Sequence, residues 1–285
     1  MKLEDAAIEF IQDKKVYCAA KTIETYTEHV NRFLNGEDAP ENLEDLTRKN
    51  IRDYVVHMRD DGLRNVTIQC YMRSIKVFSK WLYNEGYLEE DVARGIKLPK
   101  SDPKMKIPLT EEEAGRIDEA LTLTRDRIIF HLMIDAGLRV SEVCNLKRED
   151  VDFEHNYIRI RNSKNNRNRV VPLSARLKNW MQYHYTGTEW MLTSKDGKQM
   201  TTQSVKCQFH KLKKKTGIDR LHCHLCRHTF GTSYIMGDGN LELLRVMMGH
   251  TDYNTTKMYI QMATEYKIVK YPIYKLDPIF FERGY

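Results

Sequence analysis

The segment KLPKSDPKMKIP, residues 97–108, constrains the fold of this chain more than any other stretch. Its three prolines and four lysines leave too little apolar material for a core, and the prolines interrupt any helix. We therefore predict a basic linker over 97–108 that separates a helical domain over 1–96 from a second domain over 109–285. A basic linker suits a protein whose two domains close around a negatively charged partner.

The first 96 residues carry helical patterns of apolar side chains. In KTIETYTEHVNRFL the apolar positions recur every three or four residues, and Thr22 is a candidate cap. The same spacing recurs in TRKNIRDYVVHM, with Thr47 as its cap, and in NVTIQCYMRSIKVFSKWLYNEG, which closes at Gly86. Together with LEDAAIEFI at the start, these segments predict a four-helix unit of about 90 residues.

The second domain combines helices with one β-hairpin. Thr110 precedes an acidic first turn, which predicts a helix start, and RDRIIFHLMIDAG predicts a buried helix that ends near Gly137. NYIRIRNSKNNRNRVVPL alternates, breaks at an Asn-rich turn and alternates again, as a hairpin does. Further helices are predicted over 176–185, 201–216, 224–236, 240–248 and 254–264. The fold class is therefore mainly α with a small β-sheet.

The positive charge of the chain is concentrated in two runs. The formal net charge is +6, which is compatible with a polyanionic partner without proving one. KLKKK (211–215) and SKNNRNR (163–169) carry much of this charge. For either run alone, a solvated surface is as good an interpretation as a nucleic-acid contact.

Composition limits the class of protein. No apolar run reaches the roughly 18–20 residues that cross a bilayer, and MKLEDAAIEF at the start lacks a signal-peptide pattern. The six cysteines are scattered through predicted helices and do not form the framework of a small secreted domain. These features predict free thiols in a reducing compartment, the cytoplasm.

The stretch HCHLCRHT, residues 222–229, first indicates a metal. Two pairs, Cys207 with His210 and Cys223 with Cys226, have a separation found in structural zinc modules. The first pair, however, lies in a segment that predicts a continuous helix, and no turn residue separates the second pair. We therefore favour a site without metal and keep zinc as an alternative.

The same stretch also predicts an anion site. His224 and Arg227 are three positions apart and share one helix face, whereas His228 is expected to point elsewhere. A histidine and an arginine at a helix start can hold a phosphate together with the free backbone N–H groups. A solvated His–Arg pair explains the same spacing without any function.

Three segments resemble the sequence boxes of one enzyme family. AGLRVSEVCNL resembles T/S-G-L-R-I/V-S-E-L/A-x-x-L, HLCRHTFGT resembles H-x-L-R-H-S/T-F-A/G-S/T, and MMGHTDYNTTKMYI resembles L-G-H-x-x-x-x-T-T-x-x-Y. The boxes stand in the family's order, with a basic hairpin between the first and the second. On this evidence the chain resembles the tyrosine recombinases, the lambda-integrase and Xer family of site-specific DNA recombinases. Cys226 stands where that family usually has leucine, and its small apolar side chain suits the same buried position.

The resemblance implies the catalytic residues. They are Arg139, Lys164, His224, Arg227, His250 and Tyr259. It also implies a SAM-like helical domain that binds core DNA and a mixed α/β catalytic domain, which together clamp the duplex. Phosphate contacts are expected from the linker lysines and from Arg167, Arg169, Lys211, Lys213 and Lys214.

These residue types suit the attack of a tyrosine on a DNA phosphodiester. Arg139 and Arg227 each present a charged, planar fork of donors to the phosphate, and the product is a 3′-phosphotyrosine. Tyrosine ionises near pH 10, so Tyr259 needs a base, a role predicted for His224. Lys164 is expected to protonate the leaving 5′ oxygen. The implied reaction requires neither a metal nor a nucleotide cofactor.

We predict strand exchange of the integration and excision kind, for a mobile element. Members of the family act as tetramers on two duplexes, and the tail 265–285 is expected to dock on a neighbouring subunit or on its own domain. Two alternatives stay open. One is Xer-like resolution of chromosome or plasmid dimers, and the other is a non-cleaving DNA-binding regulator with zinc at the Cys/His cluster.

Overall fold

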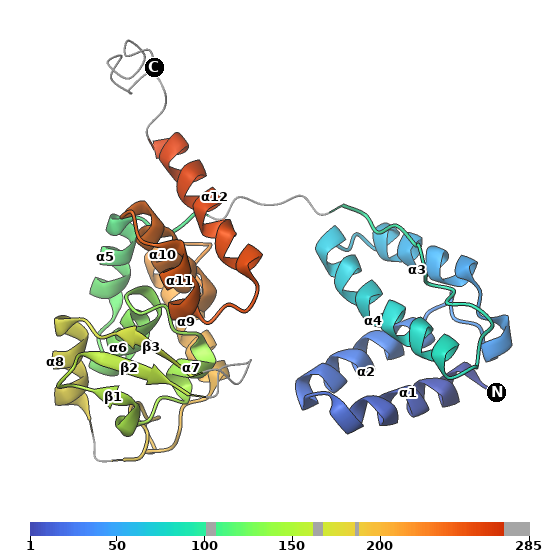
Figure 1. Ribbon diagram of the computed structural model, residues 1–285, viewed down its shortest axis with the longest axis horizontal. Coiled ribbons are helices and arrows are strands. Elements are labelled where there is room, and N and C mark those ends of the chain that lie inside the picture. The colour runs from blue at the N-terminus through green and yellow to red at the C-terminus, as the bar shows by residue number, and fades with distance from the viewer. Residues whose placement is uncertain (101–106, 162–167, 186–187, 271–285) are drawn as a thin grey trace, which may run out of the picture. The chain divides into compact units, whose positions relative to one another are not determined.

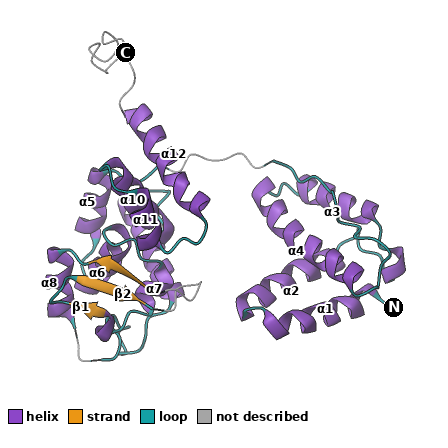
Figure 2. Cartoon of the chain, in the orientation of Figure 1, coloured by secondary structure: helices purple, strands orange, loops and turns teal. Residues whose placement is uncertain are grey.

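Two compact units make up the chain, Met1–Lys104 and Met105–Tyr285. The computed structural model describes residues 1–100, 107–161, 168–185 and 188–270, with side chains as far as Lys267. Figure 1 colours them along the chain and Figure 2 by secondary structure. Each unit has its own hydrophobic core. The predicted linker spans the boundary between the units.

Among its described residues, the N-terminal unit has four α-helices (Figure 1). They are α1 Leu3–Tyr17, α2 Ala20–Leu34, α3 Arg48–Asp60 and α4 Asn65–Asn84, with a 3-10 helix at Leu43–Asp45. Thr47 precedes α3 as predicted, and its N–H donates to Asn50 Oδ1 at 2.9 Å. The cap predicted at Thr22 is wrong. Helix α2 already begins at Ala20, and Thr22 lies inside its first turn, with its N–H bonded to the carbonyl of Ala19.

Aromatic packing closes the N-terminal unit. Phe10 of α1 is fully buried, and its ring lies 5.1 Å from that of Phe78 and 5.6 Å from that of Trp81, both on α4. Burial of one such side chain stabilises the fold by about 1.5–3 kcal/mol. The contact joins the first helix to the last, so the four helices share one core.

The C-terminal unit contains the remaining elements (Figures 1 and 2). Its helices are α5 Glu111–Ala120, α6 Thr124–Ile134, α7 Val140–Cys144, α8 Ala175–His184, α9 Thr202–Thr216, α10 Cys223–Met236, α11 Leu241–Met248 and α12 Tyr253–Lys270. A 3-10 helix covers Arg148–Asp150, and the strands are β1 Val151–Asp152, β2 Tyr157–Ile160 and β3 Arg169–Pro172. No helix in the described ranges is long and apolar enough to span a membrane.

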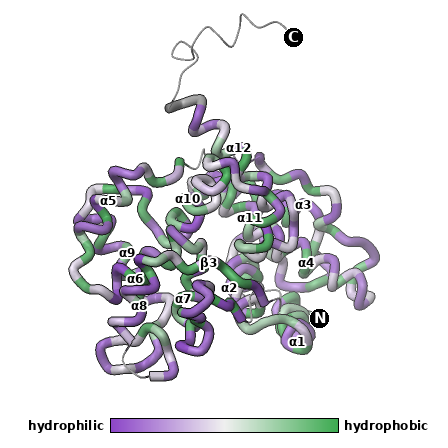
Figure 3. Tube along the Cα trace, turned by 60° about the vertical axis from the view of Figure 1, so that its left-hand side comes forward, coloured by the Kyte–Doolittle hydropathy of each residue, from purple (hydrophilic) through white to green (hydrophobic). Residues whose placement is uncertain are grey.

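The three strands form an antiparallel sheet in the order β1-β2-β3, in which Ile158 pairs with Val151 and with Val171. Ile160 and Val171 are buried while Val170 is half exposed, the alternation expected of a strand with one buried face. β3 has two valines between Arg169 and Pro172, and the trace near its label in Figure 3 is partly green, the colour of hydrophobic residues. The predicted hairpin and the fold class are confirmed. β1 was not predicted, because two residues are too few to show a period.

Helix α10 is the central helix of the C-terminal unit. It packs against α6, α11 and α12, and Figure 1 labels α10 next to α11 and α12. Eight of its 14 residues are buried, and Cys226 is fully buried, as expected for a residue in place of leucine. Because α10 carries the second sequence box, the box is held rigidly between three other helices.

Candidate active site

Four elements bring the predicted residues together. Arg139 immediately precedes α7, His224 and Arg227 lie in the first two turns of α10, His250 follows α11, and Tyr259 lies in α12. Contacts between α10 and both α11 and α12 join the second and third boxes. The residues that the three boxes predicted therefore converge at the start of α10.

Two glycines make the turns that deliver these side chains. Gly137 has φ +67°, and a Cβ there would lie 2.4 Å from the ring of Phe230. Gly249 has φ +60°, and its Cβ would lie 3.2 Å from the side chain of Arg169. Left-handed backbone in tight surroundings favours glycine. The glycines of the first and third boxes thus make the turns that place the next functional residues. Arg139 follows two residues after Gly137, and His250 follows one residue after Gly249.

Arg227 is a buried cation that joins two helix ends. It is 5% exposed, and its guanidinium donates from Nη1 to the carbonyl of Gly137, after α6, and from Nη2 to the carbonyl of Met248, at the end of α11. Burial, followed by the charge of Arg139, lowers the pKa of Arg227 to about 9. The group remains charged at neutral pH, and an arriving anion would be favoured beside it.

Glu142, which sequence reasoning did not select, is the carboxylate that organises the arginines. It accepts bonds from Arg139 Nη1 at 2.9 Å and from Arg169 Nη1 and Nη2 at 2.9 and 2.7 Å, and its Oε2 lies 3.9 Å from Arg227 Nη1. Burial alone would raise the pKa of Glu142, but the hydrogen bonds and charge of Arg169, with those of Arg139, lower it. Glu142 is therefore an ionised carboxylate beneath the site.

Arg169 requires a correction to the sequence-based expectation. We predicted that it contacts DNA, but its side chain is 3% exposed and lies inside the unit. Its Nε donates to the carbonyl of Met247 at 2.6 Å, and its two terminal nitrogens bind Glu142. Its place on β3 turns it inward, since alternate residues of a strand face opposite sides. Arg169 positions Glu142, and its side chain is too buried to contact a DNA phosphate.

His250 is held by two contacts. Its Nδ1 lies 3.0 Å from Thr256 Oγ1 and its Nε2 lies 3.4 Å from Arg227 Nη2. An arginine has only N–H groups to offer, so Nε2 accepts and the Nδ1–H donates to the threonine. Burial, then the charges of Arg227, Arg139 and Arg169, lowers the pKa of His250 to about 4. The ring is thus neutral at pH 7.

Tyr259 is seated between two histidines. It is 2% exposed, its ring is stacked on that of His250 at 6.1 Å with an interplanar angle of 6°, and its Oη lies 3.2 Å from His228 Nδ1. Burial raises the pKa of Tyr259 to about 12, against the lowering effect of Arg227 and Arg139. The phenol is therefore protonated, with a histidine nitrogen beside it.

His228 is the residue that sequence reasoning missed. We expected it to point away from the face shared by His224 and Arg227, but it contacts Tyr259. His224 and His228 are four residues apart, and positions i and i+4 of a helix are neighbours. The second histidine of the second box was the available signal.

His224 lies at the exposed start of α10. Partial desolvation and the neighbouring charges of His222, Arg227 and Arg139 lower its pKa, so the neutral form is favoured. The helix start is capped by His222, whose Nδ1 accepts from the N–H of Leu225 at 2.8 Å. His224 thus stands near both arginines at the positive end of the helix dipole.

The other predicted residues lie on α9 or outside the described residues. Lys211 and Lys214 are exposed on α9, and Lys213 lies 3.6 Å from Asp219. Lys164 and Arg167 fall in 162–167, which lies outside the described residues. The exposure of Lys211 and Lys214 is compatible with phosphate contacts, which stay a prediction.

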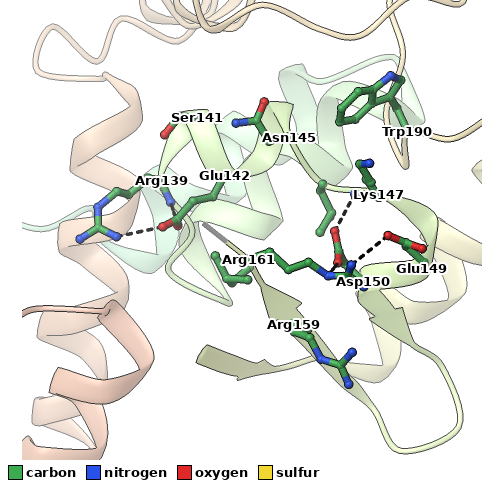
Figure 4. A pocket seen from close by; sticks show the side chains of 12 residues that line it. Arg139, Ser141, Glu142, Asn145, Lys147, Glu149, Asp150, Arg159, Arg161 and Trp190 are labelled. Carbon is green, nitrogen blue, oxygen red and sulfur yellow. Dashed lines mark hydrogen bonds and ion pairs between the residues drawn. The ribbon is translucent and has the colours of Figure 1, made fainter. Parts of the chain in front are cut away.

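A cavity of about 570 Å³ opens beside Arg139 (Figure 4). Its lining includes Lys147, Arg159, Arg161, Asp150 and Trp190. Arg161 lies 2.6 Å from Asp150, and Lys147 stands over the ring of Trp190 at 5.4 Å. The cavity extends from Arg139 and α7 along β2. Polar and charged groups line it, and several of these groups pair with each other.

The two cysteines of the stretch HCHLCRHT belong to the core. Cys223 and Cys226 are buried, and burial raises the pKa of both thiols. Cys207 lies exposed on α9. Within the described part of the chain, no group of three or more His, Cys, Asp or Glu side chains is placed to hold a metal ion.

Known proteins share the sequence and fold of both units. Residues 8–86 match the phage integrase N-terminal SAM-like domain, and residues 108–265 match the Phage integrase family. The tyrosine recombinase XerA of Thermococcus onnurineus (strain NA1) is 31% identical over 277 residues, which cover 92% of this chain and 94% of that protein.

Two solved structures have a similar fold. The Tn1549 transposon integrase in complex with a circular intermediate DNA superposes with a TM-score of 0.79 at 19% identity, covering 91% of this chain and 95% of that one. A lambda integrase tetramer bound to a Holliday junction gives a TM-score of 0.79 at 18% identity, covering 91% and 77%. At such identities the likeness establishes the fold alone.

Proposed function

The chain belongs to the phage integrase family and is a tyrosine recombinase, and we propose that it cuts and rejoins specific sites in duplex DNA with Tyr259 as its nucleophile. The observation that carries this proposal is the position of Tyr259, a buried tyrosine on whose phenol the charges of Arg139 and Arg227 act. Clustered, desolvated cations are costly for a fold. They suit a site that receives an anionic phosphate.

The charges match the transition state better than the substrate. Three guanidinium groups, of Arg139, Arg169 and Arg227, surround one carboxylate, that of Glu142, so three positive charges minus one leave two. A phosphodiester carries one negative charge and gains a second in its pentacoordinate transition state, which such a site stabilises preferentially. Each preorganised donor typically contributes about 2.7–4 kcal/mol.

Cleavage forms a bond from Tyr259 Oη to phosphorus and breaks the bond from phosphorus to the 5′ oxygen, which leaves a 3′-phosphotyrosine. The two arginines hold the non-bridging oxygens, and His224 contributes a further hydrogen bond. For His250 to donate as well, the phosphate must take the place of His250 Nε2 at Arg227, and the imidazole proton must move from Nδ1 to Nε2. Lys164 protonates the leaving 5′ oxygen. Because cationic side chains supply the charge and the phosphotyrosine conserves the bond energy, the mechanism needs no metal and no nucleotide cofactor.

We further propose that the helical unit and the catalytic unit clamp duplex DNA in the cytoplasm. Arg167, Lys211, Lys213 and Lys214 would contact phosphates and make the affinity fall steeply with salt. The lambda integrase relative forms a tetramer on a Holliday junction. By analogy, this chain would work as a homotetramer on two DNA sites, with the tail 265–285 docked on a neighbour.

For the biological role we propose integration and excision of a mobile element. Two of the solved relatives in fold are integrases of a transposon and of lambda. Xer-like resolution of chromosome or plasmid dimers is the second candidate, because a XerA recombinase is 31% identical over almost the whole chain. Mapping the sequences cleaved in host DNA separates the two roles.

The test is covalent capture on a nicked suicide substrate. Wild type should form a denaturant-resistant protein–DNA adduct, and Tyr259→Phe should form none while still binding the site. Tyr253→Phe is the matched control, since Tyr253 lies on the same helix and is 45% exposed. An adduct with Tyr259→Phe, or its loss with Tyr253→Phe alone, would refute the assignment of the nucleophile.

A further inference from the structure

We propose that His228 is the general base of cleavage, and that its Nδ1 takes the phenolic proton of Tyr259 as Oη attacks the phosphorus. The inference rests on the proposed function, because it requires that Tyr259 be the nucleophile. It replaces the expectation from sequence that His224 accepts this proton.

A proton acceptor lies within hydrogen-bond distance of the phenolic oxygen that attacks phosphorus. His228 Nδ1 lies 3.2 Å from Tyr259 Oη, within reach of a hydrogen bond, and the two ring centroids are 5.8 Å apart at an interplanar angle of 48°. A general base must first be within hydrogen-bond reach of the proton that it removes. His228 satisfies that requirement before DNA arrives.

The surroundings hold the phenol in this orientation. A Cβ on Gly231, three residues after His228, would lie 2.6–2.8 Å from atoms of the Tyr259 ring, so the ring lies directly against the bare backbone of α10. On another side the ring is stacked on His250. With its ring confined by backbone and by a parallel imidazole, Tyr259 points its hydroxyl at His228.

The phenol needs a base in this setting. With a pKa of about 12, only about one Tyr259 in 10⁵ is ionised at pH 7. A neutral imidazole that accepts the proton during attack removes the need for prior ionisation. Among the described residues, the charged and titratable groups that act on Tyr259 are Arg227 on α10, His250 beside α11, and Arg139 before α7.

The step balances in both directions. During cleavage the phenolic proton moves to His228 Nδ1, the Oη–P bond forms, and the P–O5′ bond breaks as the 5′ oxygen receives a proton from the general acid. During rejoining the 5′ hydroxyl gives its proton back to the general acid as its oxygen attacks phosphorus, the Oη–P bond breaks, and the imidazolium of His228 returns its proton to Oη. His224, exposed one turn earlier, is left to hydrogen-bond the phosphate.

The first experiment compares His228→Asn with His228→Ala in single-turnover adduct formation on the suicide substrate. An asparagine amide reproduces a hydrogen bond near the Nδ1 position but cannot hold a proton. We expect both variants to lose about 10²–10⁴-fold in rate at pH 7, with His228→Asn gaining about tenfold per pH unit as the phenolate forms. Site binding should stay within about twofold of wild type, which also reports folding. His155→Asn, at an exposed turn, is the control histidine.

The second experiment uses a substrate with sulfur in place of the bridging 5′ oxygen. A thiolate leaves without a proton, so this substrate should restore a variant that lacks the general acid but not His228→Asn. Cleavage by His228→Asn within about threefold of wild type, or its restoration by the 5′-sulfur substrate, would overturn the assignment. Absence of an adduct with wild type would instead refute the proposed function itself.

Discussion

Removal of one negative charge, by Glu142→Gln, should destabilise the catalytic unit through the arginines that Glu142 holds. The Glu142 side chain is 7% exposed and accepts two hydrogen bonds from Arg169 and two from Arg139, one of them from the Arg139 backbone N–H, and it lies close to Arg227. Glutamine keeps the size and one acceptor but loses the charge. Loss of one partner of a buried ion pair costs about 3–5 kcal/mol, because it leaves an uncompensated buried charge.

The assay is a thermal melt of the whole chain, read at the transition of the catalytic unit. For a unit of this size 1 kcal/mol corresponds to about 2–4 °C, so Glu142→Gln should lower its Tm by about 6–20 °C. Glu149→Gln is the matched control, because Glu149 is 60% exposed and pairs with Arg161 at the surface. Exposed pairs contribute about 0–1 kcal/mol, so the control should melt close to wild type.

A pH series tests whether the negative charge of Glu142, rather than its packing, stabilises the catalytic unit. The pKa of Glu142 is lower in the folded state than in the unfolded chain. Its contribution is therefore present above the unfolded pKa, near 4.3, and is lost as pH falls through the folded value. The gap in Tm between wild type and Glu142→Gln should narrow below about pH 4.3. A gap under 1 °C at pH 7, or one that persists unchanged in acid, would refute the reasoning.

Two further substitutions test the binding of the phosphate by Arg227 and the packing of the Tyr259 ring against α10. Arg227→Lys should reduce single-turnover cleavage at least ten- to a hundredfold with charge preserved. The carbonyls of Gly137 and Met248 are bound by two different nitrogens of a planar fork, which the single nitrogen of an ammonium does not reproduce. Near-normal cleavage would contradict this. Gly231→Ala places a Cβ 2.6–2.8 Å from the Tyr259 ring. Overpacking of this kind costs about 1–3 kcal/mol of stability, so the Tm should fall and adduct formation should slow. An unchanged Tm would show that α12 shifts freely.

Sequence patterns predicted the helices and the hairpin, because periodic burial leaves a direct trace in the chain, and the resemblance of the three boxes to those of a family implied that their residues form one site. They failed where an outcome depends on a contact across the fold. Arg169 belongs to a basic run, and only the pairing of β3 turns it towards Glu142. Glu142 and Arg139 were both present in the first box, but its other arginine neighbours, Arg169 and Arg227, come from β3 and α10.

The same limit explains the histidines. From the sequence, we assigned His224 to the functional face because it lies three residues from Arg227, and we assigned His228 elsewhere. Helix geometry nevertheless makes the two histidines neighbours of each other. Which of the two meets Tyr259 depends on the angle at which α12 crosses α10, and no local pattern encodes that angle. Lys164 stays a prediction, since it lies outside the described residues.

The anchoring of Arg227 bears on how inactive relatives of such enzymes are to be recognised. Because its guanidinium binds the carbonyls at the ends of α6 and α11, loss of this arginine would disturb the fold as well as catalysis. The same holds for Arg169 and Glu142, which lie inside the same unit. The presence of Arg227 and Arg169 alone therefore does not distinguish an enzyme from an inactive relative. Degeneration into a DNA-binding protein would appear first at Tyr259 and His228, whose pairing contributes to chemistry more than to architecture.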